Sequence, residues 1–257
     1  MTKLFVEPSQ VLGNTIEITD KGDIRHIIKV LRLKKGDAVQ VSDSATWEYD
    51  TEIEEISNEL VVLRICDKQK FAKEPELQIT LFQGIPKAGK MELIVQKSVE
   101  LGAYSVVPVF MERTVVTDKG NFSKKIERWQ KVAGEAAKQC KRGIVPEVGS
   151  AMDFKKMCER LSGFDLVLFP YENEENLTIK DCLRKITAAA GDPGDGEAAQ
   201  FPRTVAIIIG PEGGFSDKEA DLLKEMGVNC VSLGKTILRT ETAGLAAIAM
   251  TMYELEL

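Results

Sequence analysis

Histidine is nearly absent from this chain, which has 257 residues but contains only His26. A catalytic dyad of serine or cysteine with histidine would have to be built on that one side chain. Cysteine is also sparse, because its five residues lie far apart and form no C-x-x-C pair. The sequence therefore favours reduced thiols over a disulfide framework or a zinc site, and we expect no metal.

Long apolar runs are missing as well, although 44% of the residues are hydrophobic and can fill a substantial core. No run is long enough to cross a bilayer. The first residues, MTKLFVEPSQ, lack the apolar segment of a secretory signal. We therefore expect a cytoplasmic protein that has no membrane partner.

The net charge of −6 argues against nucleic acid as a partner, but the charges are unevenly distributed. Acidic residues cluster at 48–59, 172–175 and 254–256, whereas basic residues cluster at 25–35 and 119–142. A single basic cluster is usually a solvated surface. Two such clusters on an acidic chain favour contact with RNA.

The part of the chain up to residue 71 has the pattern of a small β domain. Short apolar runs alternate with turn residues such as Lys35-Gly36-Asp37, and residues 22–33 between them predict a short basic helix. The apolar runs are Leu4–Val6, Thr15–Ile18, Ala38–Val41 and Leu60–Ile65. We expect a barrel-like domain at 1–71 and a linker at 72–76, which contains Pro75.

From Leu77 onward strands and helices alternate, which is the pattern of an α/β domain with a mostly parallel sheet. The predicted strands are 77–82, 105–110, 165–169, 204–209 and 228–232, and the predicted helices are 87–101, 122–142, 177–188, 216–226 and 240–253. Ser216 and Glu219 form a capping box at the start of one helix. Residues 189–203 are rich in Gly, Pro and Asp and predict a long exposed loop.

The last predicted helix is apolar nearly all round over Ala243–Met252, so most of its surface must be buried. A subunit interface and an internal position would both satisfy this requirement. The sequence does not choose between them.

The segment Gly84-Ile-Pro-Lys-Ala-Gly89-Lys90 has the G-x-x-x-x-G-K spacing of a phosphate-binding loop and lies between a predicted strand and helix. Met91 follows, where such a loop needs a serine or threonine to bind Mg²⁺. Pro86 and Lys87 also suit poorly a loop that wraps backbone amides around a phosphate. A P-loop nucleotide hydrolase is therefore kept only as an alternative.

A second glycine-rich segment, Gly210-Pro-Glu-Gly-Gly214, joins the strand at 204–209 to the capped helix. Ligands of open α/β sheets bind beyond the carboxyl ends of the strands, where glycines allow close approach of the backbone. Glu212 would repel a pyrophosphate but would suit a cationic ligand. An ordinary tight turn is the alternative, and the segment alone does not decide.

The segment SLGKTILRTETA at 232–243 follows the last strand and leads into the apolar helix. Arg239 and Glu241 follow the apolar Ile237 and Leu238 abruptly. A surface ion pair at a helix start, with Thr240 as the N-cap, would explain them. Arg239 could instead hold an anionic or carbonyl-rich substrate with two hydrogen bonds.

Two stretches, IIIGPEGGFS and SLGKTILRTETAGLAAI, resemble the C-terminal signature of RsmE-type enzymes, the small-subunit ribosomal RNA uridine-N3 methyltransferases. FVEP and HIIKVLRLKKGD resemble the PUA-like domain of that family, and PKAGKMELIVQKSVELG, Glu112–Thr114 and RWQKVAGEAAKQCKR also fit its pattern. The resemblance thus covers nearly the whole chain. Two departures lie in regions expected to contact RNA: Lys3 replaces the usual arginine, and KQCKR replaces a form containing serine and asparagine.

The resemblance implies a SPOUT fold, with a trefoil knot at about 165–257 inside a methyltransferase domain at 77–257. The domain at 1–71 would then be a PUA-like RNA-binding domain. S-adenosylmethionine (SAM) is the implied cofactor, held by three loops. The cofactor-binding residues carried over to this sequence are Phe169, Pro170, Tyr171, Gly210, Pro211, Glu212, Gly213, Gly214, Leu233, Gly234, Ile237, Leu238, Arg239, Thr240 and Ala243.

The implied reaction is SAM-dependent methylation of N3 of a specific uridine in 16S ribosomal RNA, by a homodimer that acts on a small-subunit particle. Loss of the N3 proton leaves negative charge on O2 and O4, and we assign Arg239 to stabilise it. Glu212 and Glu241 are both candidates to accept the proton or orient the base, and the sequence cannot rank them. The predicted RNA contacts are Arg25, Lys29, Arg32, Lys87, Arg113, Arg128, Lys138 and Arg142. A non-catalytic RNA-binding protein is a further alternative.

Overall fold

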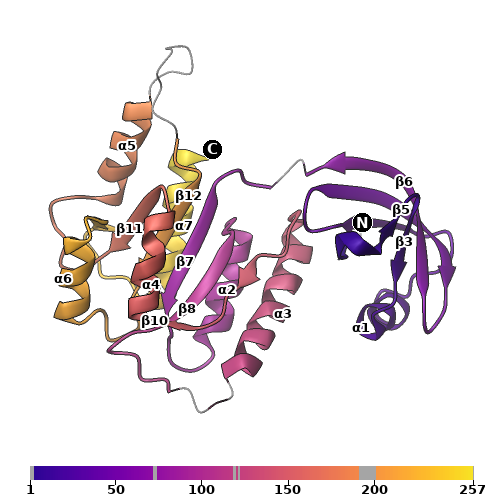
Figure 1. Cartoon of the computed structure of the whole chain (residues 1–257), viewed down its shortest axis with the longest axis horizontal. Helices are drawn as coiled ribbons and strands as arrows, with labels where there is room; N and C mark the ends of the chain where they lie inside the picture. Colours follow the sequence, from indigo (N-terminus) through magenta and orange to yellow (C-terminus); the bar gives the residue numbers. More distant parts are fainter. Residues whose placement is uncertain (1–2, 72–73, 118–119, 121, 191–200, 257) are drawn as a thin grey trace. The chain divides into compact units, whose positions relative to one another are not determined.

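A computed structural model describes residues 3–71, 74–117, 120, 122–190 and 201–256, and the chain forms two compact units (Figure 1). The N-terminal unit consists of Met1–Glu74 and Ala137–Val145, and the C-terminal unit consists of Pro75–Ala136 and Pro146–Leu257. Parts of the expected linker, 72–73, and of the expected long loop, 191–200, lie outside the described residues.

The N-terminal unit is built on a six-stranded sheet with the strand order β1-β4-β5-β6-β3-β2. The strands are β1 (Lys3–Phe5), β2 (Val11–Leu12), β3 (Thr15–Ile18), β4 (Ala38–Ser42), β5 (Trp47–Ile56) and β6 (Val61–Lys70). Strand β1 runs parallel to β4, and the other pairs are antiparallel. The core includes Ile16, Val39 and Leu63, which are fully buried. The predicted small β domain is confirmed.

Strand β5 is absent from the elements that the sequence predicted, because its region stands out only as an acidic cluster. Tyr49, Thr51 and Ile53 are buried and alternate with acidic residues, which is the period of a strand with one buried face. The helix predicted at 22–33 forms as α1 (Lys21–Arg25), followed by a π-helical turn, η2 (His26–Val30).

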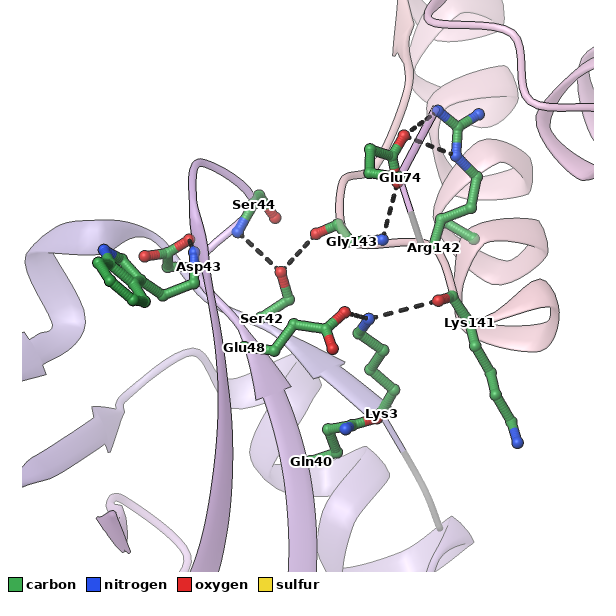
Figure 2. Close-up of polar contacts among 12 residues, drawn as sticks. Lys3, Gln40, Ser42, Asp43, Ser44, Glu48, Glu74, Lys141, Arg142 and Gly143 are labelled. Atoms are coloured by element: carbon green, nitrogen blue, oxygen red, sulfur yellow. Dashed lines mark hydrogen bonds and ion pairs between the residues drawn. The ribbon is translucent and has the colours of Figure 1, made fainter. Parts of the chain in front are cut away.

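Residues 137–145, which the sequence assigned to the catalytic domain and in part to its helix at 122–142, belong to the N-terminal unit. Figure 2 shows how they are held. Arg142 forms an ion pair with Glu74, and the second carboxylate oxygen of Glu74 accepts the N–H of Gly143 at 2.9 Å. The hydroxyl of Ser42 donates to the carbonyl of Gly143. Lys3 pairs with Glu48 and lies 3.5 Å from the carbonyl oxygen of Lys141.

Lys3, which marks one departure from the family pattern, and Arg142, the last residue of the KQCKR stretch that marks the other, are therefore interior. Lys3 is 4% exposed and Arg142 is 6% exposed. The structure thus places Arg142 inside the unit, paired with a carboxylate, and not on the surface expected of an RNA contact.

The C-terminal unit contains a parallel sheet with the order β10-β8-β7-β12-β11-β13, and β9 pairs with β8. The strands are β7 (Gln78–Gly84), β8 (Ser105–Phe110), β9 (Glu147–Val148), β10 (Met152–Asp153), β11 (Leu166–Pro170), β12 (Thr204–Ile209) and β13 (Asn229–Val231). All of these pairs are parallel, which confirms the predicted α/β class. The two-residue strands β9 and β10 are too short to leave a sequence pattern.

Helices cover both faces of this sheet. They are α2 (Lys90–Glu100), α3 (Phe122–Cys140), α4 (Phe154–Arg160), α5 (Ile179–Ala190), α6 (Asp217–Glu225) and α7 (Thr240–Leu255). Met157 of α4 and Leu223 of α6 share one core with Phe82 and Ile208 of the sheet. The neighbouring strand residue Leu81 lies against Gly244 of α7, on the other face. The capping box predicted for α6 is confirmed.

Within the described ranges, no helix combines the length and apolar character needed to span a membrane.

Helix α7 is partly internal. Ile248 and Met252 are 0% and 7% exposed within the single chain, so their side of the helix belongs to the subunit's own core. Tyr253 is 73% exposed, and Met250 is 39% exposed. The internal position that the sequence left open therefore holds for one side of the helix, while the other side faces outward.

The hydroxyl of Thr240, at the start of α7, joins the ends of two strands to that helix. It donates to the carbonyl of Gly210, after β12, at 2.6 Å. It accepts a hydrogen bond from Nε2 of Gln83, near the end of β7, at 2.9 Å. Thr240 is only 7% exposed, so water does not readily replace its hydroxyl.

We predict that Thr240→Val lowers the free energy of unfolding by about 1–3 kcal/mol, because the carbonyl of Gly210 loses a buried donor. Urea denaturation should be compared with that of Thr242→Val, which makes the same change at an exposed position of the same helical turn. Equal unfolding free energies for the two variants would contradict the prediction.

The two glycines of the G-x-x-x-x-G-K segment give a second prediction. A Cβ atom at Gly84 would lie 2.5 Å from the backbone nitrogen of Pro211, whereas one at Gly89 would meet nothing within 4 Å. We expect Gly84→Ala to lower the melting temperature by about 4 °C or more, because backbone must move, and Gly89→Ala to change it far less. A P-loop would need both glycines to bind nucleotide. If Gly84→Ala and Gly89→Ala lowered the melting temperature by the same amount, Gly84 would have no special role in packing against Pro211.

Candidate active site

The segments that follow β11, β12 and β13 line a cavity of about 460 Å³ and an adjoining cavity of about 120 Å³. Both lie at the carboxyl ends of the parallel strands, which is where α/β sheets bind ligands. Pro170, Glu172, Ile237, Leu238 and Ala243 line both cavities. The predicted cofactor residues that line one cavity or both are Pro170, Tyr171, Gly210, Pro211, Glu212, Gly213, Gly214, Leu233, Gly234, Ile237, Leu238, Arg239, Thr240 and Ala243.

Phe169 and Glu241 differ from the other predicted cofactor-binding and catalytic residues because they are not part of the cavity lining. Phe169 is fully buried, and its ring stacks on Tyr171 at 5.2 Å and packs edge-on against Phe215 at 4.8 Å between ring centroids. It supports the wall of the cavity from within the core. Glu241 contacts the cavity through Lys90, as described below.

Gly214 is required by the loop itself. Its φ angle is +67°, a conformation that residues with a side chain rarely adopt. A Cβ at this position would also lie 2.8 Å from Oε1 of Glu172. The backbone conformation and the nearby Glu172 are therefore enough to explain a glycine at position 214, without a ligand that approaches closely. A substitution at Gly214 would strain the loop whether or not a ligand binds there.

Lys90, in the first turn of α2, is the site residue that sequence reasoning missed. Its Nζ atom lies 3.1 Å from Oε1 of Glu212 and 3.1 Å from Oε2 of Glu241. The backbone N–H of Lys87 also donates to both carboxylate oxygens of Glu212, at 3.1 and 3.2 Å. The spacing G-x-x-x-x-G-K had suggested a phosphate for this ammonium, but the ammonium is paired with two carboxylates.

This cluster shifts the pKa of each of its members. Hydrogen bonds to Glu241 and Glu212 raise the pKa of the Lys90 ammonium. Burial alone would raise the pKa of the Glu212 carboxyl, but hydrogen bonds from its own backbone, Lys90 and Lys87 outweigh burial and lower it. The pKa of Glu241 is lowered by its own backbone N–H, then by Lys90, with a further contribution from the charge of Arg239. All three groups are therefore ionised at neutral pH.

Arg239 is exposed and lines the larger cavity at the start of α7. It is the N-cap residue of this helix, and its carbonyl accepts the N–H groups of Thr242 and Ala243, each at 2.8 Å. Thr240, for which the sequence suggested the N-cap role, is the first helical residue and uses its hydroxyl on Gly210 and Gln83.

The residues predicted to contact RNA are divided between the two units and differ in exposure. Arg25, Lys29, Arg32 and Lys87 are exposed, Arg113 donates to the carbonyl of Gly213 at 3.1 Å, Arg128 pairs with Glu92, and Lys138 is partly buried. Arg113 thus lies beside the glycine loop.

Among the described residues, no group of histidine, cysteine and carboxylate side chains could hold a metal ion.

Comparison with known proteins agrees with this geometry. A family model described as an RNA methyltransferase domain matches residues 73–252, and one described as an RNA methyltransferase PUA domain matches residues 18–66. The chain is 33% identical to ribosomal RNA small subunit methyltransferase E of Bacillus subtilis, over 100% of the chain and 95% of the relative. It is 30% identical to the protein of that name from Aquifex aeolicus, over 93% of the chain and 95% of the relative.

A solved structure gives the same result at the level of the fold. Ribosomal RNA small subunit methyltransferase E from Neisseria gonorrhoeae, bound to S-adenosyl methionine, has a TM-score of 0.79 and 27% identity, and the similarity covers 98% of this chain and 97% of the other. The PUA-like domain and the methyltransferase domain expected from the sequence are both matched. The chain therefore belongs to the ribosomal RNA small subunit methyltransferase E family of RNA methyltransferases.

Proposed function

We propose that this protein transfers a methyl group from SAM to N3 of a specific uridine in the 16S ribosomal RNA of a small-subunit particle. The observation that carries the proposal is the pair of adjoining cavities. They are lined by the three expected cofactor loops, and the larger one has two cations in its lining, Lys90 and Arg239. Membership of the family and the SAM-bound relative from N. gonorrhoeae support it.

The side chains around the cavities suit SAM. Glu172 lines both cavities and Glu212 lines the larger one, so carboxylates are available to a ligand that carries a sulfonium and an ammonium. Ile237, Leu238 and Ala243 line both cavities and would provide apolar contacts to its adenosine part. A triphosphate would instead be repelled by the same carboxylates.

When bound, SAM supplies an electrophilic methyl group and leaves as a neutral thioether. The side chains of the protein would stabilise the negative charge that forms on uracil. N3 loses its proton, and the electron pair of the broken N–H bond is shared with O2 and O4 until it forms the new bond to carbon. A fixed cation beside one of these oxygens lowers the barrier, and Arg239 is the residue that we assign to it.

Of the two carboxylates that the sequence left unranked, Glu212 is the one that we assign to accept the N3 proton. It lines the larger cavity, whereas Glu241 does not. It is ionised at neutral pH, which a proton acceptor requires, and its lowered pKa makes it a weaker base than a free carboxylate. Glu241 then holds Lys90 in place from outside the cavity lining.

The alternative of a P-loop hydrolase is disfavoured by the same cluster. Lys90 is paired with carboxylates, and Met91, which stands where a P-loop needs a hydroxyl, is 1% exposed and packed in the core. The other alternative, a non-catalytic RNA-binding protein, would be supported by a chain that binds RNA but neither binds SAM nor methylates the RNA.

We further propose a homodimer with the knotted SPOUT topology. After β13 at the edge of the sheet, α7 returns to pack against the central strands β7 and β12, a path that is compatible with a knot. The outward side of α7 includes Tyr253 and Met250, an apolar surface that a second subunit would cover.

We predict that Ala243→Leu weakens SAM binding by about tenfold or more, because the larger side chain occupies space in both cavities while it preserves helix propensity. The matched control is Thr242→Leu, the exposed neighbour, which should bind SAM like the wild type. Isothermal titration calorimetry measures both. An unchanged dissociation constant in Ala243→Leu would show that SAM does not occupy this site.

We predict that Arg239→Ala lowers the single-turnover rate of methyl transfer by about a hundredfold, or roughly 3 kcal/mol of transition-state stabilisation. Arg239→Lys should recover only part of it, since an ammonium cannot reproduce the planar guanidinium. RNA affinity should change little, because many phosphate contacts share that load. Near-normal turnover in Arg239→Ala would remove this residue from catalysis. Turnover restored by excess SAM would move it to cofactor binding.

A further inference from the structure

Lys90 has donor capacity beyond its two ion pairs. An ammonium carries three N–H donors. Two carboxylates, Glu212 and Glu241, each lie 3.1 Å from its nitrogen. The side chain is 31% exposed, and it is part of the wall of the larger cavity. One donor is therefore available to a ligand in that cavity.

The two carboxylates also fix how Lys90 presents this donor. Glu212 comes from the loop after β12 and Glu241 from the first turn of α7, so the ammonium is held by two separate segments. An ammonium only donates hydrogen bonds and never accepts them. Arg239, the other cation in the cavity lining, is likewise a donor only.

We infer that Lys90 and Arg239 bracket the two groups beside N3 of the target base, and that Lys90 thereby selects uracil over cytosine. The inference rests on the proposed function, since it concerns the same reaction. Uracil carries a carbonyl oxygen on each side of N3, and each oxygen accepts a hydrogen bond. Cytosine carries a carbonyl oxygen on one side and an amino group, a donor, on the other. In either orientation, cytosine would place its amino group against one of the two cations.

A preference for uracil over cytosine has to come from the site, because N3 of cytosine is intrinsically the more reactive of the two nitrogens at neutral pH. N3 of cytosine has a lone pair without losing a proton, whereas N3 of uracil must first be deprotonated. A cavity that merely fitted a pyrimidine would therefore allow methylation of cytosine. A site built to donate hydrogen bonds to both groups beside N3 rejects a base that presents a donor in place of one acceptor.

The test uses small-subunit particles reconstituted from transcribed, unmodified 16S ribosomal RNA. The position that the wild-type enzyme methylates is mapped first by mass spectrometry, and a second particle then carries cytidine at that position. Single-turnover rates are measured on both particles at saturating SAM. If the wild type methylates no position, the proposed function itself fails. If it does methylate, the variants decide the role of Lys90.

Lys90→Gln replaces the obligate donor with an amide that also accepts. We expect its rate on uridine to fall by about ten- to a hundredfold and its preference for uridine over cytidine to fall by about tenfold or more. Lys90→Arg keeps a cation with donors only and should keep the preference. The control Lys97→Met removes a lysine of the same helix that pairs with Glu100, and it should behave like the wild type.

A preference in Lys90→Gln equal to that of the wild type, with both rates lowered in parallel, would overturn the inference, because Lys90 would then only support the structure. Melting temperature and SAM affinity are measured for every variant. If Lys90→Gln does not fold, Lys90→Met is judged by the same ratio of rates.

Discussion

The buried hydroxyl of Thr240 is the interaction on which the rest of the site depends, because one side chain fixes three segments of the chain. Through Gly210 it positions the glycine loop, through Gln83 it holds the end of β7, and it stands directly after Arg239. A buried carbonyl needs a donor, so these segments cannot separate without leaving a polar group unpaired. The cavity is therefore defined by the fold before any ligand enters.

Charges of both signs are then arranged on this framework. Lys90, Glu212 and Glu241 keep one another ionised, and Arg239 adds a second cation to the cavity. Carboxylates suit a cationic cofactor, while the two cations suit the negative charge that the proposed reaction would develop on the base. The same cavity would have to accommodate a cationic cofactor and a negative charge on the base. A uniformly acidic or uniformly basic lining would suit only one of the two. The mutual pairing also explains how carboxylates remain charged although they are partly buried.

Much of the fold could be predicted from local sequence, whereas the pairing of charges could not. The apolar strand at 204–209 and the capping box of Ser216 and Glu219 are local patterns, and the structure confirms both. Lys90 lies 151 residues from Glu241, and its local pattern suggested a phosphate instead. Arg142 appeared as one of many surface cations because Glu74, 68 residues away, gives no sign of being its partner. Long-range ion pairs leave no periodicity, so only the folded chain reveals them.

The most direct test of the central claim is a calorimetric titration of the wild-type protein with SAM and, separately, with ATP. The account predicts saturable binding of one SAM per chain and no binding of ATP, because the cavity presents carboxylates that repel a triphosphate and that already neutralise the charge of Lys90. Saturable binding of ATP without any binding of SAM would contradict it, and would return the G-x-x-x-x-G-K segment to the role of a phosphate-binding loop.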